Sequence, residues 1–209
     1  MKKALLLLLC AATGPASAQM PPIDHSRHRD LATWKVAIAA YSQRHYGDNE
    51  WRLRPTCIVL HYTAGRSFPE NLVSSSSFVN ETPGLASHYV VDGQHIWEIL
   101  PPTVRCRGTY GINHHAISIE MVAAEANDLL ARKQTMDTAA RLVVGLLQQF
   151  DLKPEAVYSH QQVATMNPSV VPGVYDRVNG RPYDKIDPGA GAMKYILAEV
   201  RRQLAKAAP

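Results

Sequence analysis

The sequence predicts an α/β domain in which a single mixed β-sheet is flanked by helices. Short apolar runs rich in β-branched residues, typical of buried strands, occur at 57–63 and 116–122. Two amphipathic segments, 134–150 and 190–204, carry apolar residues at helical spacing. Strands mixed with helices around one apolar sheet favour a layered α/β sandwich.

The amino-terminal half of the chain supplies one clear helix before the first strand. Residues 19–29 are polar and contain proline, and we expect a poorly ordered lead-in there. Asp30 can cap a helix over 31–45, whose apolar residues fall at helical spacing. A further helix is expected to start within 69–78.

The middle of the chain predicts a hairpin and a short strand. Segments 87–92 and 95–100 flank Gly93-Gln94, which favours a hairpin turn. Residues 156–159 form a short strand-like run. The segment 161–184 is rich in proline and glycine, so we expect an ordered loop rather than another helix.

The first residues have the pattern of a secretory signal peptide. Lys2 and Lys3 precede an apolar run that is too short to span a membrane, and a small-residue cleavage site ends at Ala18. We therefore expect residues 1–18 to be removed and the mature protein to be periplasmic or secreted, without stable membrane insertion. Cys10 raises a lipoprotein alternative, but leucines rather than small residues precede it, which argues against lipidation.

Charge and cysteine content narrow the possible partners. The formal net charge of +4 falls to +2 when Lys2 and Lys3 leave with the signal peptide. This mild charge, with no basic block and no glycine-rich phosphate loop, gives no support for nucleic acid as a partner. Cys57 and Cys106 remain in the mature chain, and an oxidising compartment permits one disulfide between them. Two buried thiols are the open alternative, and a monomer is the default expectation.

Three residues have the types of a catalytic zinc site. His61 ends an apolar strand, His160 follows the strand-like run 156–159, and Asp187 precedes Pro-Gly. Two histidines and one carboxylate leave one position of a zinc ion open for water. Each residue alone is more typical of a structural role, and their spacing is not a compact metal motif, so the residues by themselves leave both interpretations open.

The roles of two further charged residues, Glu120 and Lys185, depend on the direction in which their side chains point. Glu120 alternates with apolar neighbours on the strand 116–122, so it faces either solvent or a cleft, where it is a general-base candidate. Lys185 and Asp187 point to one side if their segment is extended, which Pro188 favours. They form either a weak surface ion pair or two parts of one centre.

Five motifs, in this order, carry a resemblance to a known family: CIVLHYTAG, SHYVVDGQHIWEIL, SIEMV, YSHQQV and YDKIDPG. Over roughly residues 52–205 the chain resembles zinc-dependent N-acetylmuramoyl-L-alanine amidases. This family includes phage T7-type lysozymes, bacterial cell-wall recycling amidases and animal peptidoglycan recognition proteins. The resemblance implies a peptidoglycan-recognition-protein-like amidase fold. It also implies peptidoglycan or muropeptide as the substrate, cut between the lactyl group of N-acetylmuramic acid and L-alanine.

The resemblance also implies roles for the candidate residues. His61, His160 and Asp187 match the ligands of one Zn²⁺, and Glu120 matches the catalytic acid/base. Lys185 matches a lysine whose ammonium group would stabilise the oxyanion of the reaction. The implied organisation is a signal peptide (1–18), an amino-terminal extension with a helix (19–51) and a zinc amidase domain (52–209).

The sequence departs from the family pattern near the expected substrate groove. Arg107 stands roughly where the family often has a substrate-contacting histidine; it either clamps a stem-peptide carboxylate or is a solvated loop charge. Asn113 is a second candidate for substrate contact. His114 and His115 are expected to face solvent or backbone, and His88 to be structural or to support the site from behind.

Two questions stay open at this level. The long segment 161–184 either walls the groove or is a neutral surface insertion. The protein is either an amidase, a non-catalytic peptidoglycan sensor on the same fold, or a different metallohydrolase such as a peptidase that uses the same site.

Overall fold

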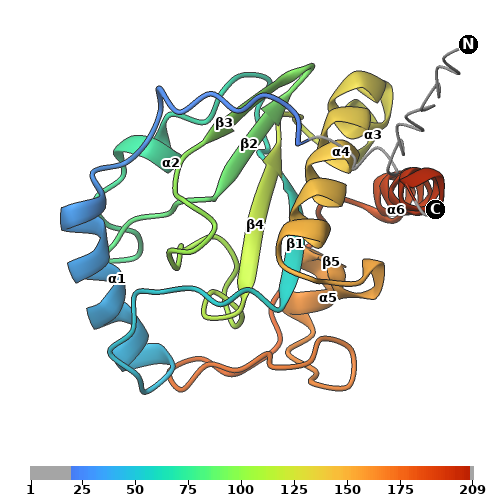
Figure 1. The fold of residues 1–209 in the computed structure, drawn as a ribbon. Helices are drawn as coiled ribbons and strands as arrows, with labels where there is room; N and C mark the ends of the chain where they lie inside the picture. Colours follow the sequence, from blue (N-terminus) through green and yellow to red (C-terminus); the bar gives the residue numbers. More distant parts are fainter. Residues whose placement is uncertain (1–19, 208–209) are drawn as a thin grey trace, which may run out of the picture.

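The computed structural model describes residues 20–207 and contains a five-stranded mixed sheet with the order β3-β2-β4-β1-β5 (Figure 1). β2 and β3 are antiparallel, whereas β2–β4, β4–β1 and β1–β5 are parallel pairs. This confirms the predicted fold class. The strands are Cys57–Tyr62 (β1), Tyr89–Asp92 (β2), His95–Glu98 (β3), Ala116–Met121 (β4) and Val157–Ser159 (β5).

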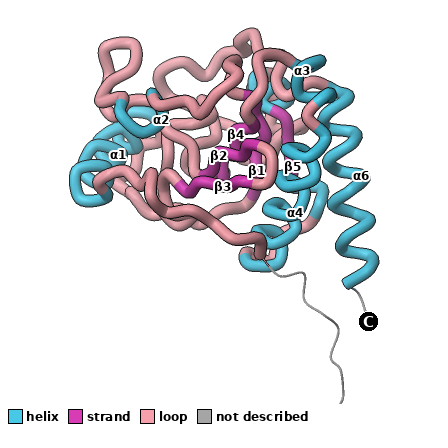
Figure 2. Tube along the Cα trace, turned by 90° about the horizontal axis from the view of Figure 1, so that it is seen from above, coloured by secondary structure: helices cyan, strands magenta, loops and turns pink. Residues whose placement is uncertain are grey.

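The helices form layers on the two sides of the sheet. Figure 2 shows α4 and α6 on one side, and α1 and α2 with long loops on the other. The helices are Leu31–His45 (α1), Asn71–Ser74 (α2), Ala126–Ala131 (α3), Lys133–Gln149 (α4), His160–Ala164 (α5) and Ala190–Ala207 (α6), with a 3₁₀ turn at Pro154–Ala156 (η1). Of these helices, none is long and apolar enough to cross a bilayer.

The main core lies between the sheet and the α4/α6 layer. Ile58 and Leu60 of β1 join Ile117 and Ile119 of β4 in this cluster, together with the apolar stripes of α4 and α6. These four side chains are fully buried. Because strand side chains alternate, their neighbours Val59, His61, Ser118 and Glu120 are directed to the opposite face. That face carries polar groups, and long loops cover it together with α1 and α2.

The lead-in before α1 docks on the sheet, contrary to the poorly ordered segment expected for residues 19–29, of which residues 20–29 are described. Asp24 pairs with Trp97 along β3, donating from its amide to the Ile96 carbonyl at 2.8 Å and accepting from the Glu98 amide at 2.9 Å. The Arg29 amide then donates to the Ile99 carbonyl at 3.0 Å. The amino-terminal segment is therefore held by backbone hydrogen bonds to the edge of β3 and to Ile99 just after it.

The helix expected to start within 69–78 is present as α2, which begins at Asn71 and has four residues. Its last residue donates from Ser74 Oγ to the Glu70 carbonyl, and Ser75 Oγ donates to the Ser77 carbonyl just beyond the helix. The segment 161–184 is not all loop, because α5 occupies its start. A capping box between Ser159 and Gln162 starts this short helix.

Cys57 and Cys106 are both buried free thiols, which decides the alternative between one disulfide and two thiols. Burial raises the pKa of each thiol to about 12. Cys106 Sγ lies 3.3 Å from Nδ1 of the buried His88, which also accepts the Ser118 amide at 2.9 Å. His88 is therefore structural: it links the loop at Cys106 to β4. The expected signal peptide 1–18, with Cys10, lies outside the described residues.

A buried histidine ties α1 to the loops beside it. His45 Nδ1 lies 2.8 Å from Asp176 Oδ2, and Nε2 lies 3.0 Å from both oxygens of Glu81. Arg44 and Arg107 also donate to Glu81. Burial alone would lower the pKa of His45, but its hydrogen bonds to the two carboxylates and their charges raise it. The same contacts lower the pKa values of Asp176 and Glu81 against the effect of burial.

We expect His45→Gln to lower the free energy of unfolding more at pH 5.5 than at pH 8.5. The raised pKa means that the contribution of protonated His45 is complete below the unfolded value of about 6.5, and is lost as pH rises through the folded value. Both carboxylates remain ionised across this range. Urea unfolding at the two pH values measures the difference. The exposed His95→Gln is the control, with a small effect at either pH, and an equal loss for His45→Gln at both pH values would contradict the assignment.

Candidate active site

The pocket that contains the predicted site residues lies on the sheet face opposite α4 and α6. It has a volume of about 760 Å³. His61 comes from the end of β1, Glu120 from the end of β4, and His160 follows β5 directly. These three strands are parallel neighbours. The carboxyl ends of parallel strands are where α/β sheets place ligand sites.

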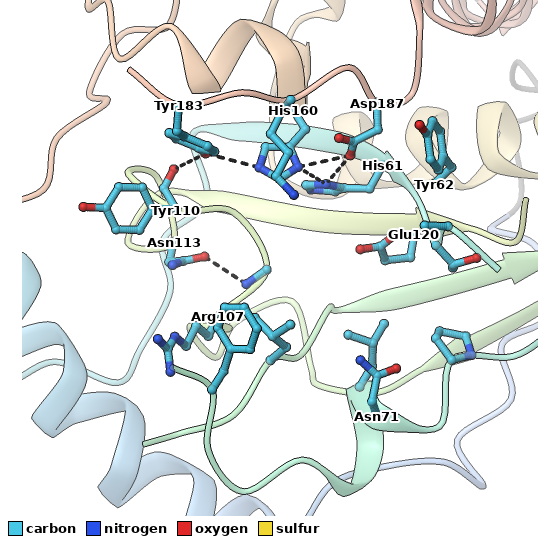
Figure 3. Close-up of a pocket in the computed structure, with 18 of the residues that line it drawn as sticks. His61, Tyr62, Asn71, Arg107, Tyr110, Asn113, Glu120, His160, Tyr183 and Asp187 are labelled. Atoms are coloured by element: carbon cyan, nitrogen blue, oxygen red, sulfur yellow. Dashed lines mark hydrogen bonds and ion pairs between the residues drawn. The ribbon is translucent and has the colours of Figure 1, made fainter. Parts of the chain in front are cut away.

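His61, His160 and Asp187 converge on one point in this pocket (Figure 3). Nδ1 of His61 lies 2.9 Å from Nδ1 of His160, and Asp187 Oδ2 lies 3.1 Å from each nitrogen. All three side chains are buried. Three predicted residues that are far apart in sequence therefore present three donor atoms to one small volume.

The local backbone explains how each donor reaches this point. His160 is the first residue of α5, so the capping box at Ser159 fixes the direction of its side chain. The Gln161 amide donates to the Asp187 carbonyl at 3.2 Å, which ties the start of α5 to the carboxylate segment. Gly189 then turns the chain into α6 with a φ of 90°, a conformation that glycine adopts without strain.

The second nitrogen of each histidine has a protein partner. His61 Nε2 lies 2.8 Å from Thr109 Oγ1, and His160 Nε2 lies 3.2 Å from Tyr183 Oη. The Tyr183 hydroxyl donates to the Tyr110 carbonyl at 2.9 Å, so its oxygen is free to accept from His160 (Figure 3). An Nε2–H on both rings leaves both Nδ1 lone pairs directed at the point of convergence, the tautomer that a metal ligand needs.

These residues fit a bound metal ion. A tetrahedral metal with bonds of about 2.0–2.1 Å holds its ligand atoms about 3.3 Å apart, and the three donor atoms are separated by 2.9, 3.1 and 3.1 Å. Outward shifts of a few tenths of an ångström would complete the geometry. Two imidazoles and one carboxylate are also a ligand set of catalytic zinc sites.

The electrostatics of the cluster favour a bound cation. Burial would raise the pKa of Asp187, but its contacts with His160 and His61 hold it well below its usual range. Burial, followed by the charge of His61, lowers the pKa of His160 to about 4, although Asp187 acts in the opposite direction. An ionised Asp187 beside a neutral His160 is part of the protonation pattern that metal binding requires.

Glu120 stands beside this cluster as a carboxylate with one buried, unpartnered oxygen. It lines the pocket, and its Cα is the register partner of His61 on the neighbouring strand. Oε2 has no hydrogen-bond partner. Burial and the negative charge of Asp187 raise its pKa, while the charges of His61 and Lys185 oppose the rise. A carboxylate with a raised pKa is a stronger base, which suits a group that accepts and releases a proton.

Lys185 lines the same pocket from its outer wall. Its side chain is exposed, and it makes no ion pair with Asp187 in the described part of the chain. The surface ion pair that the sequence left open is therefore wrong. The extended segment instead directs Asp187 to the histidines and leaves the Lys185 ammonium free to meet a ligand.

Arg107 forms part of the pocket wall, with its guanidinium group already engaged. It donates to the Glu81 carbonyl at 2.9 Å, the Pro83 carbonyl at 2.6 Å and the Glu81 carboxylate at 3.2 Å. It also lies between the rings of Tyr41 and Phe78, at 4.9 and 5.6 Å. With 11 % of its side chain exposed, it is not a solvated loop charge. A clamp on substrate stays a prediction.

Asn113 lines the pocket and also shapes the loop that supports His61. Its Oδ1 accepts from the amides of Gly108 and Thr109, at 3.0 and 2.7 Å. This holds Thr109 against the His61 ring. His114 stacks on Tyr46 at 4.0 Å, and it does not belong to the metal-donor cluster.

Sequence reasoning missed Thr109 and Tyr183, the partners of the two histidines. Thr109 lies in an irregular loop and carries no pattern that marks it. Tyr183 could have been predicted, because it lies two residues before Lys185 and four before Asp187 on one extended segment. Alternate residues of an extended segment point to the same side, so Tyr183 shares the side of the other two. The end of the segment 161–184 thus walls the pocket.

Comparison with known protein families identifies the family of this chain. The sequence matches the family model for N-acetylmuramoyl-L-alanine amidase over residues 51–174. The chain belongs to the N-acetylmuramoyl-L-alanine amidase family. The predicted resemblance is thereby confirmed, and with it the class of enzyme, a hydrolase of the peptidoglycan amide. The match includes His61, Glu120 and His160 and ends before Lys185 and Asp187.

Solved structures show the same fold for this amidase. The hydrolase AmiA of Staphylococcus aureus in complex with its ligand has a TM-score of 0.55 at 22% identity, covering 91% of this chain and 89% of that chain. The endolysin amidase LysCS from Clostridium intestinale has a TM-score of 0.54 at 16% identity, covering 88% and 98%. A search of the curated proteins finds no match.

We expect Tyr183→Phe and Thr109→Val each to weaken metal binding by about 10–100-fold, because each removes the group that orients one histidine. Competition with a chromophoric chelator measures the affinity for Zn²⁺. The exposed Tyr175→Phe is the control and should bind as the wild type does. Unchanged affinity in both variants would show that these contacts do not organise the metal ligands.

Proposed function

We propose that this amidase is zinc-dependent and hydrolyses the amide between the lactyl group of N-acetylmuramic acid and the L-alanine of a peptidoglycan stem peptide. One observation carries the proposal. Three buried donor atoms converge beside a buried carboxylate oxygen without a partner, in a pocket of a chain of this family. The pocket of about 760 Å³ is within the range of small-ligand sites.

His61 and His160 would hold the Zn²⁺ through Nδ1, and Asp187 through Oδ2. When bound, the metal supplies Lewis acidity, which polarises a carbonyl and lowers the pKa of water to about 7. Thr109 and Tyr183 keep the histidines in the required tautomer and orientation.

Glu120 would move the proton of the reaction. Hydrolysis forms a bond from the water oxygen to the lactyl carbonyl carbon and breaks the bond from that carbon to the alanine nitrogen. The Glu120 carboxylate takes a proton from the attacking water and returns it to the leaving nitrogen. Burial raises its pKa, which makes the carboxylate a stronger base for the first of these transfers.

Lys185 would stabilise the negative oxygen that develops on the carbonyl. Its ammonium group lines the pocket and has no carboxylate partner among the described residues. A cation directed at developing charge lowers the barrier because it needs no reorganisation during the step. Arg107 and Asn113 remain proposed contacts for the rest of the substrate. We further propose that the enzyme is exported, because its substrate is the cell wall, and that it acts as a monomer, the default expectation.

Product analysis separates this function from a sensor and from a peptidase. Incubation of the zinc-loaded protein with muropeptides should release peptides with a free L-alanine amino terminus, which mass spectrometry identifies. A cut within the peptide would favour a peptidase. Zinc binding without any cut would favour the sensor.

We expect Glu120→Gln to reduce turnover by about 10²–10⁴-fold while zinc stays bound, because the amide cannot accept the proton of water. Turnover of muropeptides and zinc content are measured on the same sample. Glu125→Gln, an exposed carboxylate just after β4, is the matched control. Loss of zinc from the Glu120 variant would show a role in metal binding instead.

Lys185→Met and Asp187→Ala should have different effects on zinc binding and on turnover. The first should keep zinc and lose about 10²–10³-fold in kcat, the effect of removing one oxyanion-stabilising group. The second should lose zinc, since it removes one of three ligands. Lys194→Met, on the exposed side of α6, is the control for Lys185. Equal and small losses in both variants would contradict the two separate roles.

A further inference from the structure

A second cluster of donor atoms lies where the amino-terminal segment docks on β3. Backbone hydrogen bonds at Asp24 and Arg29 fix this segment at both ends of a short turn. The turn carries His25 and His28, three residues apart, and places them over Glu98 of β3 (the segment runs from the start of the coloured chain to α1 in Figure 1). Two imidazoles and one carboxylate again meet.

The three donor atoms are close enough to share one ligand. Nδ1 of His25 lies 3.1 Å from Nε2 of His28, which lies 2.9 Å from Glu98 Oε1. His25 Nδ1 and Glu98 Oε1 are 3.4 Å apart. The three separations are close to the value of about 3.3 Å between ligand atoms of a tetrahedral zinc ion.

Hydrogen bonding alone does not satisfy this cluster when both histidines are neutral. No choice of neutral tautomers satisfies all three contacts: N–H groups on both rings would repel each other across the 3.1 Å contact, and an N–H on only one ring leaves one contact without a donor. The Glu98 side chain is 10 % exposed, and its only ion-pair partners in the part of the chain that the structure describes are these two histidines. A buried carboxylate needs a positive partner, and a metal ion would supply one.

Glu98 has the kind of hydrogen-bond partner that orients a carboxylate ligand toward a metal ion. The Tyr89 hydroxyl donates to Glu98 Oε2 at 3.0 Å, which fixes the carboxylate and leaves Oε1 directed at the histidines. His25 is 59 % exposed, so the cluster is open to solvent on one side, where a metal can enter and keep a water. Nitrogen-rich donor sets favour Zn²⁺ over Mg²⁺ and Ca²⁺, which prefer oxygen.

This cluster is separate from the candidate active site. Glu98 is the register partner of Tyr89, and Tyr89 packs in the core beneath α4, so both side chains lie on the α4 side of the sheet. The pocket with His61 is on the opposite face, and none of the three cluster residues lines it. We propose that His25, His28 and Glu98 form a second Zn²⁺ site, which fastens the amino-terminal segment to the edge of the sheet.

Metal stoichiometry tests the proposal. Protein starting at residue 19 is stripped with a chelator, and Zn²⁺ alone is added in equilibrium dialysis. The wild type should bind two equivalents, whereas His28→Gln and Glu98→Gln should each bind one. Glu98→Gln retains an acceptor for Tyr89, which guards against a folding defect. The control His95→Gln, an exposed histidine on β3, should bind two.

Variants that lack the active-site metal ligand Asp187 are measured in parallel. They show whether a missing equivalent of Zn²⁺ belongs to the active site or to the second site. Asp187→Ala should retain one equivalent, and Asp187→Ala with His28→Gln should retain none. No binding by Asp187→Ala would overturn the second site and leave the first intact. One equivalent that persists in the double variant would also overturn it, because that ion would be bound elsewhere.

Proteolysis supplies a readout tied to the segment itself. Trypsin can cut after Arg27 only when the turn leaves β3, so a ligand that binds only the docked form should slow the cut. In the Asp187→Ala background, Zn²⁺ at 100 times its dissociation constant should slow cleavage about 100-fold. His28→Gln in the same background should show no protection. Equal rates with and without Zn²⁺, or protection that survives His28→Gln, would overturn the proposal.

Discussion

The parallel register that sets His61 beside Glu120 is the constraint on which the rest of the pocket depends. Both residues belong to strands whose alternate side chains are fully buried beneath α4 and α6. A slip of one residue would place these polar groups in the apolar core. The apolar side of the sheet therefore determines which side chains meet on its polar side, although Leu60 and Ile119 do not line the pocket.

The amino-terminal helix contributes to this pocket although it precedes the family match. Tyr41 of α1 lines the pocket and stacks on His45, which binds Glu81 and Asp176. Glu81 in turn holds Arg107 in the pocket wall. One side of the pocket is thus built from α1, the loop at Glu81 and the segment before Tyr183, joined by buried charges. Its shape depends on all three segments.

Periodicity predicted the parts of the molecule that depend on neighbours along the chain. Alternation on two strands indicated which face His61 and Glu120 take, and helical spacing indicated α4 and α6. The lead-in escaped prediction because its hydrogen bonds come from β3, far away in the sequence. The helix that starts at Asn71 was predicted, but its early end was not, because serine side chains compete for the backbone there. Thr109 escaped because its partner His61 is 48 residues away and nothing local marks a hydroxyl as a histidine support.

The docked amino-terminal segment also protects the sheet. β3 ends the strand order, so its outer row of amides and carbonyls would be a template for pairing with another molecule. Residues 24–29 take up part of that row with their own backbone. A chain that began at α1 would retain the pocket residues and yet expose an unpaired strand edge beside Trp97. The segment therefore acts against aggregation as well as holding two histidines in place.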